Sequence, residues 1–472
     1  MEVTSLVRKA VFAAGCLFTL TASAQTPVFD STAYLAHYAT RWQSRTLETP
    51  YQDNISEQEK IAGLSKLWME AKLNYANFDL VPRLDFDSLY LAFIPKVQHT
   101  KSTLAYYEEL QSFYHHLKDG HSLVLVPTQL TAQTKAVVPM LVHPIEGKPV
   151  IWKVLDKRLR DLGIREGMEI TSVDGIPVAA RMADRARKAS YSTPQDSAAR
   201  VMYYWLTAGN VAEKAKLEVV DKKGKAKSFD VPRADYYKGN LFPSPMFQTP
   251  LEYSVLPNNV GYLQLHTFND PRVVAQFDSV FSQIAKTDAL IIDVRTNGGG
   301  NGGYGHEILG YLTDKPFQTG KTHILQYQGV QRPWGNNPYS TEVSSYDWKP
   351  YKDKRYNKPV FLLTGPLTYS AAEDFTLAFL STDRGLVIGE ATGGSTGQPV
   401  FFMLPGGGFG AVCAKRDLFW DNRQFVGYGI QPDVQVPLKI KDVQNGKDTQ
   451  LEKALALLKK GITTRDHLSK LP

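Results

Sequence analysis

Two short serine-containing patterns in this chain could support nucleophilic catalysis. Residues 393–397 read Gly-Gly-Ser-Thr-Gly and match G-x-S-x-G, in which a strained turn between a strand and a helix exposes the serine. We expect no helix after Ser395, because residues 398–404 have an early proline followed by β-branched and aromatic residues, which is typical of a strand. The segment is therefore interpreted as a glycine-rich loop between strands, and an esterase that uses Ser395 is the less favoured alternative.

Ser370 has the context that Ser395 lacks. A strand is expected over residues 360–364, a turn follows, and a helix is expected to begin at Ser370. At such a helix N-terminus the amide of Ala371 could stabilise an oxyanion, helped by the positive end of the helix dipole. The structural alternative is a capping box, in which the side chains of Ser370 and Glu373 each accept a hydrogen bond from a backbone amide.

A nucleophilic serine needs a base, and the chain has ten histidines. His121 lies in Asp-Gly-His-Ser, residues 119–122, between an expected helix and an expected strand, where a side chain can project into a cleft. Gly120 is expected to adopt the left-handed conformation that ends the helix. His266 and His306 stay open as alternatives. No Cys/His spacing indicates zinc, so we predict neither metal nor cofactor.

A glycine-rich loop follows the buried strand expected over residues 289–294. Glycines let backbone amides approach a ligand closely, as in phosphate loops and oxyanion holes. The loop lacks the Gly-Lys-Ser/Thr ending of a phosphate loop. The amides of Gly298 and Gly299 are therefore candidate oxyanion donors, and a plain flexible turn is the alternative.

The composition and the order of the expected elements indicate an α/β protein with several domains. At 472 residues, 43% hydrophobic and 21% charged, the chain is an ordinary soluble globular protein. We predict an N-terminal helical domain over residues 25–135, short strands over 136–235 and an α/β core of alternating strands and helices over 236–472. Residues 162–178 resemble the centre of a PDZ domain, which binds peptides as an added strand.

The first residues predict export. Residues 1–24 have two basic residues, an apolar run and an Ala-Ser-Ala site, which is the pattern of a signal peptide. We expect a periplasmic or cell-envelope protein, with a lipoprotein anchored through Cys16 as the less favoured alternative. Only Cys413 remains after cleavage, so a disulfide scaffold is excluded. The net charge is +7, but its densest lysine run, residues 222–227, is interpreted as a solvated hairpin tip, so we predict no nucleic-acid partner.

Five segments in this order resemble the C-terminal processing and tricorn-type serine peptidases. They are residues 119–122, 292–300, 369–373, 389–394 and 426–434. The resemblance implies a crotonase-like ββα core, no metal and an acyl-enzyme mechanism with Ser370 as the nucleophile. The processing branch has a catalytic lysine where this chain has Ser395, so that dyad is absent. The tricorn-like branch has a histidine base, which His121 matches.

The resemblance leaves the third catalytic member unassigned. Tricorn-type enzymes support the histidine through a serine and a glutamate, and the matching positions here are Gly120 and Val426. The candidates for this supporting role are Ser395, Asp119, Glu373 and Asp433. The sequence therefore predicts an exported serine endopeptidase that acts on peptides or unfolded proteins, with a homo-oligomer left open. The competing hypothesis is a catalytically inactive peptide- or lipid-binding protein on the same fold.

Overall fold

A computed structural model describes residues 28–42, 45–234, 249–351 and 353–470. The predicted signal peptide lies outside these residues. The chain divides into residues 1–46, which include helix α1 (Ser31–Trp42), and a compact unit of residues 47–472. The domain boundaries expected at 135 and 235 stay predictions. Within the described ranges, no helix is both long and apolar enough to cross a membrane.

Residues 47–135 are mostly helical. They form α2 (Glu57–Asn74), η1 (Phe78–Leu80), α3 (Phe86–Gln98), α4 (Thr103–His115), β1 (Leu123–Leu125) and α5 (Thr128–Thr134). Ser56 and Glu59 make a capping box at the start of α2. After α4, Lys118 has the left-handed backbone, with φ 54°, and Gly120 does not. The left-handed conformation expected of Gly120 is therefore wrong.

Residues 136–234 carry a six-stranded sheet with the order β2-β3-β4-β6-β7, in which β5 also pairs with β4. Its elements are β2 (Met140–Ile145), β3 (Lys148–Val154), α6 (Lys157–Asp161), β4 (Glu169–Val173), β5 (Ile176–Pro177), α7 (Val178–Ala186), α8 (Pro194–Arg200), η2 (Val201–Trp205), β6 (Lys214–Val220) and β7 (Ala226–Pro232). Asp174 and Gly175 both have positive φ between β4 and β5, so they form a tight hairpin turn there. The tip of the β6–β7 hairpin carries the predicted lysine run.

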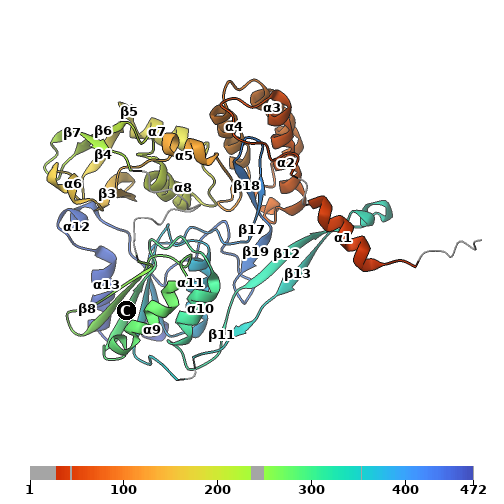
Figure 1. Cartoon of the computed structure of the whole chain (residues 1–472). Coiled ribbons are helices and arrows are strands. Elements are labelled where there is room, and N and C mark those ends of the chain that lie inside the picture. Colours follow the sequence, from red (N-terminus) through yellow and green to blue (C-terminus); the bar gives the residue numbers. More distant parts are fainter. Residues whose placement is uncertain (1–27, 43–44, 235–248, 352, 471–472) are drawn as a thin grey trace, which may run out of the picture. The chain divides into compact units, whose positions relative to one another are not determined.

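The larger C-terminal part is built on a second sheet, with the order β20-β16-β15-β10-β9-β8 (Figure 1). Its strands are β8 (Leu251–Leu256), β9 (Val260–Leu265), β10 (Ala289–Asp293), β15 (Val360–Thr364), β16 (Gly385–Gly389) and β20 (Val434–Gln435). All neighbours are parallel except β8, which is antiparallel to β9. Every residue of β10, β15 and β16 is buried, as expected for parallel strands covered on both faces.

Helices cover this central sheet on both faces. On one face, α9 (Arg272–Ile284), α10 (Gly302–Gly310) and α11 (Ala371–Thr382) pack with alternate residues of β10, such as Leu290 and Ile292. On the other, α13 (Thr449–Lys459) packs against Ile291 (Figure 1). The alternation follows the two-residue period of a strand and makes the sheet a rigid platform.

Two small sheets connect this core to the N-terminal elements. Strand β1 pairs with β18 (Phe409–Cys413), which pairs in turn with β17 (Pro399–Met403). Strand β12 (Lys321–Tyr327) pairs with β13 (Tyr339–Ser344) and β19 (Lys415–Leu418). The other elements are β11 (Phe317–Gln318), η3 (Gly329–Trp334), β14 (Asp347–Trp348), α12 (Ile440–Gln444) and α14 (Arg465–Ser469). The β1–β18 pairing brings the segment after α4 to the core.

Candidate active site

Three loops meet where neighbouring parallel strands of the central sheet end. One follows β10 and contains Gly298 and Gly299, one follows β15 and contains Ser370, and one follows β16 and contains Ser395. Ligands of open α/β sheets bind at the carboxyl ends of the strands, because the loops there converge. His121 comes from the connection between α4 and β1, and reaches the same place.

Ser370 lies at the turn into α11 with φ 53° and ψ −128°, a strained backbone for a residue with a side chain. Its side chain does not cap the helix. The carboxylate of Glu373 accepts hydrogen bonds from the amides of Gly394 and Ser395 and from the hydroxyl of Thr392. The capping-box interpretation is therefore wrong, because Glu373 turns away from Ser370 and holds the loop after β16.

The imidazole of His121 lies between two hydroxyl groups. Its Nε2 is 3.0 Å from Ser370 Oγ, and its Nδ1 is 2.8 Å from Ser395 Oγ. The carboxylate of Asp119 accepts hydrogen bonds from the backbone amides of His121 and Ser122, so it fixes the loop and not the ring. Among the described residues, no carboxylate is hydrogen-bonded to this imidazole.

Tyr369 supports the imidazole both directly, by stacking on its ring, and indirectly, through Ser395. This role was not identified from the sequence. The ring of Tyr369 stacks on that of His121, with centroids 5.0 Å apart and planes 9° from parallel. Its hydroxyl donates to Ser395 Oγ over 2.7 Å, and the guanidinium of Arg200 lies 4.2 Å from its ring centroid. The residue before the serine gave no signal of this role in the sequence, since the contact depends on how the loops meet.

The same tyrosine explains why residue 120 is a glycine. A Cβ added to Gly120 would lie 1.8 Å from the hydroxyl oxygen of Tyr369, closer than any real contact. The space of a side chain at position 120 is therefore occupied by Tyr369. In place of the serine and glutamate of the tricorn-like pattern, this chain has a tyrosine and Ser395 beside the histidine.

The candidate oxyanion donors differ in what their amides already bind. The amide of Gly299 donates to Asn297 Oδ1 over 2.9 Å, so this amide is not free to bind an oxyanion. Within the described residues, the amides of Gly298 and Ala371 have no hydrogen-bond acceptor. Gly299 has φ 96°, and a Cβ there would lie 2.6 Å from that of Ser370. Gly298 and Ala371 are thus the available donors, and Gly299 is the glycine that lets the loop approach the serine.

Burial sets the charge states around the site. Burial, followed by the positive charges of Arg200 and Lys415, lowers the pKa of His121 to about 3, so its imidazole is neutral at pH 7. Burial raises the pKa of Glu373 to about 8, although its three hydrogen-bond donors oppose that shift. A neutral imidazole is the form that can accept a proton from a serine.

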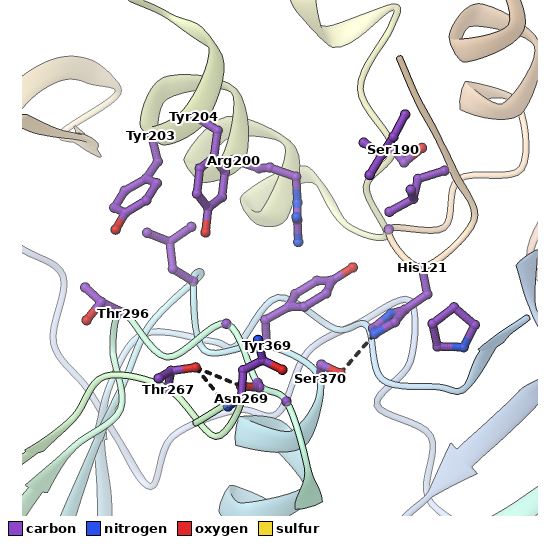
Figure 2. A pocket seen from close by; sticks show the side chains of 18 of the residues that line it. His121, Ser190, Arg200, Tyr203, Tyr204, Thr267, Asn269, Thr296, Tyr369 and Ser370 are labelled. Atoms are coloured by element: carbon purple, nitrogen blue, oxygen red, sulfur yellow. Dashed lines mark hydrogen bonds between the residues drawn. The ribbon is translucent and has the colours of Figure 1, made fainter. Parts of the chain in front are cut away.

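The serine and histidine line a cavity of about 710 Å³ (Figure 2). Figure 2 shows Ser370 and His121 joined by their hydrogen bond, with Tyr369 beside them and Arg200 and Tyr204 above. Residues of both β1 and β17 also line the cavity. These are the two outer strands of their sheet, so an extended peptide could lie along either edge.

Two other candidates lie elsewhere. Asp433 accepts from the amide of Val387 and from Arg465, so it supports β16 and α14 and does not contact His121. No helix follows Ser395, whose side chain is buried, so the strand-turn-helix context of a nucleophile elbow is absent from the described structure. Over the described ranges, no group of three or more His, Cys, Asp or Glu side chains could hold a metal ion.

Comparison with known proteins agrees with this geometry. Residues 259–436, which include β10, β15 and β16 and their loops, match the model of peptidase family S41. The chain is similar to peptidase family S41 over this segment. It is 29% identical over 180 residues to a chloroplastic C-terminal processing peptidase of Tetradesmus obliquus, covering 38% of this chain and 35% of that protein. The family is one of serine peptidases.

A second relative and a solved structure extend the comparison. A putative tricorn-like protease C-terminal subunit of Sulfurisphaera tokodaii is 25% identical over 185 residues, covering 39% of this chain and 19% of that protein. The crystal structure of mature CPAF superimposes with a TM-score of 0.65 at 18% identity, covering 86% of this chain and 97% of that chain. At that identity the likeness is one of fold. The chain spans well under half of the length of these curated relatives.

Proposed function

We propose that the chain is a serine endopeptidase in which Ser370 is the nucleophile and His121 the general base. The contact between Ser370 Oγ and His121 Nε2, inside a cavity at the carboxyl ends of the S41 strands, carries this proposal. We also propose that the fold consists of a crotonase-like core, a PDZ-like domain over residues 136–235 and a helical N-terminal domain. The leader pattern of residues 1–24 supports export to a periplasm or cell envelope.

The reaction begins with proton transfer from serine to histidine. In the tautomer that this requires, Nε2 of His121 accepts the proton of Ser370 while Nδ1–H donates to Ser395 Oγ. Ser370 Oγ then bonds to the scissile carbonyl carbon, and the carbonyl electrons move to its oxygen. The amides of Gly298 and Ala371 are the donors for that oxyanion.

The acyl-enzyme forms when the imidazolium returns its proton to the leaving amine. Water then attacks the ester with His121 again as base, and the second product leaves with a carboxylate. Ser395 and Tyr369 act here as positioning residues, because they hold Nδ1 and the ring plane. The negative charge of the developing oxyanion favours the imidazolium, which opposes the effects of burial and of Arg200 and Lys415 on the pKa of His121.

A fluorophosphonate probe tests the proposal directly. The purified protein should gain one adduct by intact mass, and peptide mapping should place it on Ser370. Ser370→Ala should abolish labelling and hydrolysis of a casein substrate, while Ser190→Ala, a serine of the same cavity that does not contact His121, should leave both unchanged. An adduct on Ser395 would identify a different nucleophile, and hydrolysis that survives in Ser370→Ala would refute the assignment.

A further inference from the structure

The catalytic cavity contains four cationic side chains, and three of them already have a carboxylate partner. Lys188 pairs with Glu108 at 2.9 Å, Arg200 with Asp196 at 3.0 Å and Arg272 with Asp270 at 2.6 Å. The fourth is Lys135. Lys188, Arg200 and Arg272 are thus each neutralised by a carboxylate of the chain itself.

Lys135 differs because no carboxylate of the described residues lies within ion-pair distance of its ammonium. It is half-buried at the C-terminal end of α5, and its Nζ lies 5.8 Å from the ring centroid of Trp205. Burial lowers its pKa to about 8, which leaves the ammonium form dominant at pH 7.

Apolar side chains line part of the cavity that contains this ammonium. Leu123 and Leu125 of β1, Trp205, Leu367 and Phe401 line the same cavity. A charge moved from water into such surroundings loses hydration, and a carboxylate brought to it restores part of that loss. A substrate with a carboxylate near this unpaired cation should therefore bind more tightly than a neutral substrate.

From this arrangement we infer that Lys135 is a specificity-determining residue that binds a substrate carboxylate in the cavity of Ser370. The inference rests on the proposed peptidase function and names its substrate class: polypeptides with a carboxylate at a fixed distance from the scissile bond and apolar residues around it. Two sources have this chemistry, an Asp or Glu side chain and the terminal carboxylate of the peptide. The other cations of the cavity do not compete, since each is held by its own carboxylate.

Internally quenched peptides separate the two sources. A neutral, mostly apolar parent peptide is made with Glu or Gln at each position in turn, and each peptide is made with a free or an amidated C-terminus. We expect one of these changes to raise kcat/KM by about tenfold, since a hydrogen bond between charged partners is worth roughly that factor or more. A preference for Glu at one position indicates side-chain recognition, and a preference for the free acid indicates terminal recognition.

Variants of Lys135 and Lys188 show which lysine causes the preference for acidic substrates. Lys135→Gln should reduce the ratio of acidic to neutral substrate toward one, and Lys135→Arg should keep much of it. Lys188→Gln is the matched control, because it removes a lysine of the same cavity that already has a partner, and it should leave the ratio unchanged. A wild-type enzyme without preference, or a preference that survives in Lys135→Gln, would overturn the inference.

A binding measurement keeps this test separate from that of catalysis. In the Ser370→Ala background, fluorescence anisotropy of the labelled peptides should show the same carboxylate preference and its loss with Lys135→Gln. Equal affinities for the acidic and neutral peptides would refute the role of Lys135, whatever the activity. If the wild-type protein binds the acidic peptides preferentially but hydrolyses none of the peptides, the role of Lys135 is supported and the peptidase assignment is refuted.

Discussion

Removing the hydroxyl of Ser395 should slow catalysis without removing the nucleophile. In Ser395→Ala, Nδ1–H of His121 loses the acceptor that lies 2.8 Å away, in a buried site. An unsatisfied buried donor costs about 1 to 3 kcal/mol. If that loss falls on the transition state, kcat/KM drops by about 5- to 150-fold, because each 1.36 kcal/mol is a factor of ten in rate.

The structure isolates this effect from a collapse of the loop. The amide of Ser395 donates to Glu373 and its carbonyl accepts from the amide of Ser370, and both contacts survive in the alanine variant. Tyr369→Phe removes only the hydroxyl that donates to Ser395, so we expect a smaller decrease of about 2- to 12-fold from a neutral hydrogen bond of roughly 0.5 to 1.5 kcal/mol.

The assay is kcat/KM on a fluorogenic peptide, together with the rate of fluorophosphonate labelling of Ser370. Both rates should fall in Ser395→Ala and recover in part in Ser395→Thr, whose hydroxyl can accept the same hydrogen bond. Thermal unfolding of each variant shows whether folding has changed. Full activity of a well-folded Ser395→Ala would refute the idea that this serine positions the base.

Three further predictions concern the same loops. Because burial lowers the pKa of His121 to about 3, protonation should not remove the base between pH 7 and 5, and kcat/KM should stay flat there; a half-maximum at pH 6.5 would contradict this. Gly299→Ala should abolish activity and lower the melting temperature, because residue 299 has φ 96° and the added Cβ would meet the Cβ of Ser370. Gly298→Ala is the control: the added Cβ has open space there, so the variant should keep the wild-type melting temperature. Gly120→Ala should destabilise the fold, and adding Tyr369→Phe should restore part of the loss; additive effects by thermal unfolding would refute the contact.

Much of the fold could be predicted from local pattern. The strand expected over residues 360–364 is present with those bounds, and the one expected over 289–294 ends one residue earlier, since buried parallel strands read as short, nearly continuous apolar runs. The helix expected to begin at Ser370 begins one residue later, at Ala371. Strong periodicity and local capping decide these elements, so a single sequence is enough to find them.

The predictions that were wrong concern residues whose conformation depends on contacts between distant segments of the chain. Ser370 and Glu373 have the spacing of a capping box, but the positive φ of Ser370 and the amides of the loop after β16 draw Glu373 elsewhere. Gly120 is required by the hydroxyl of Tyr369, which lies 249 positions away in the chain, and not by its own backbone. No local pattern encodes such a contact, so the support of the histidine could not be predicted.

The distance along the chain between the reacting groups has a consequence for biosynthesis. His121 and Ser370 are separated by 249 positions, and His121 and Ser395 by 274. A ribosome therefore completes the base long before the nucleophile and its loop, and an unfinished polypeptide has no means of acylation. In the proposed mechanism hydrolysis requires these segments to meet, so proteolytic activity should report on whether the two parts of the chain have folded together.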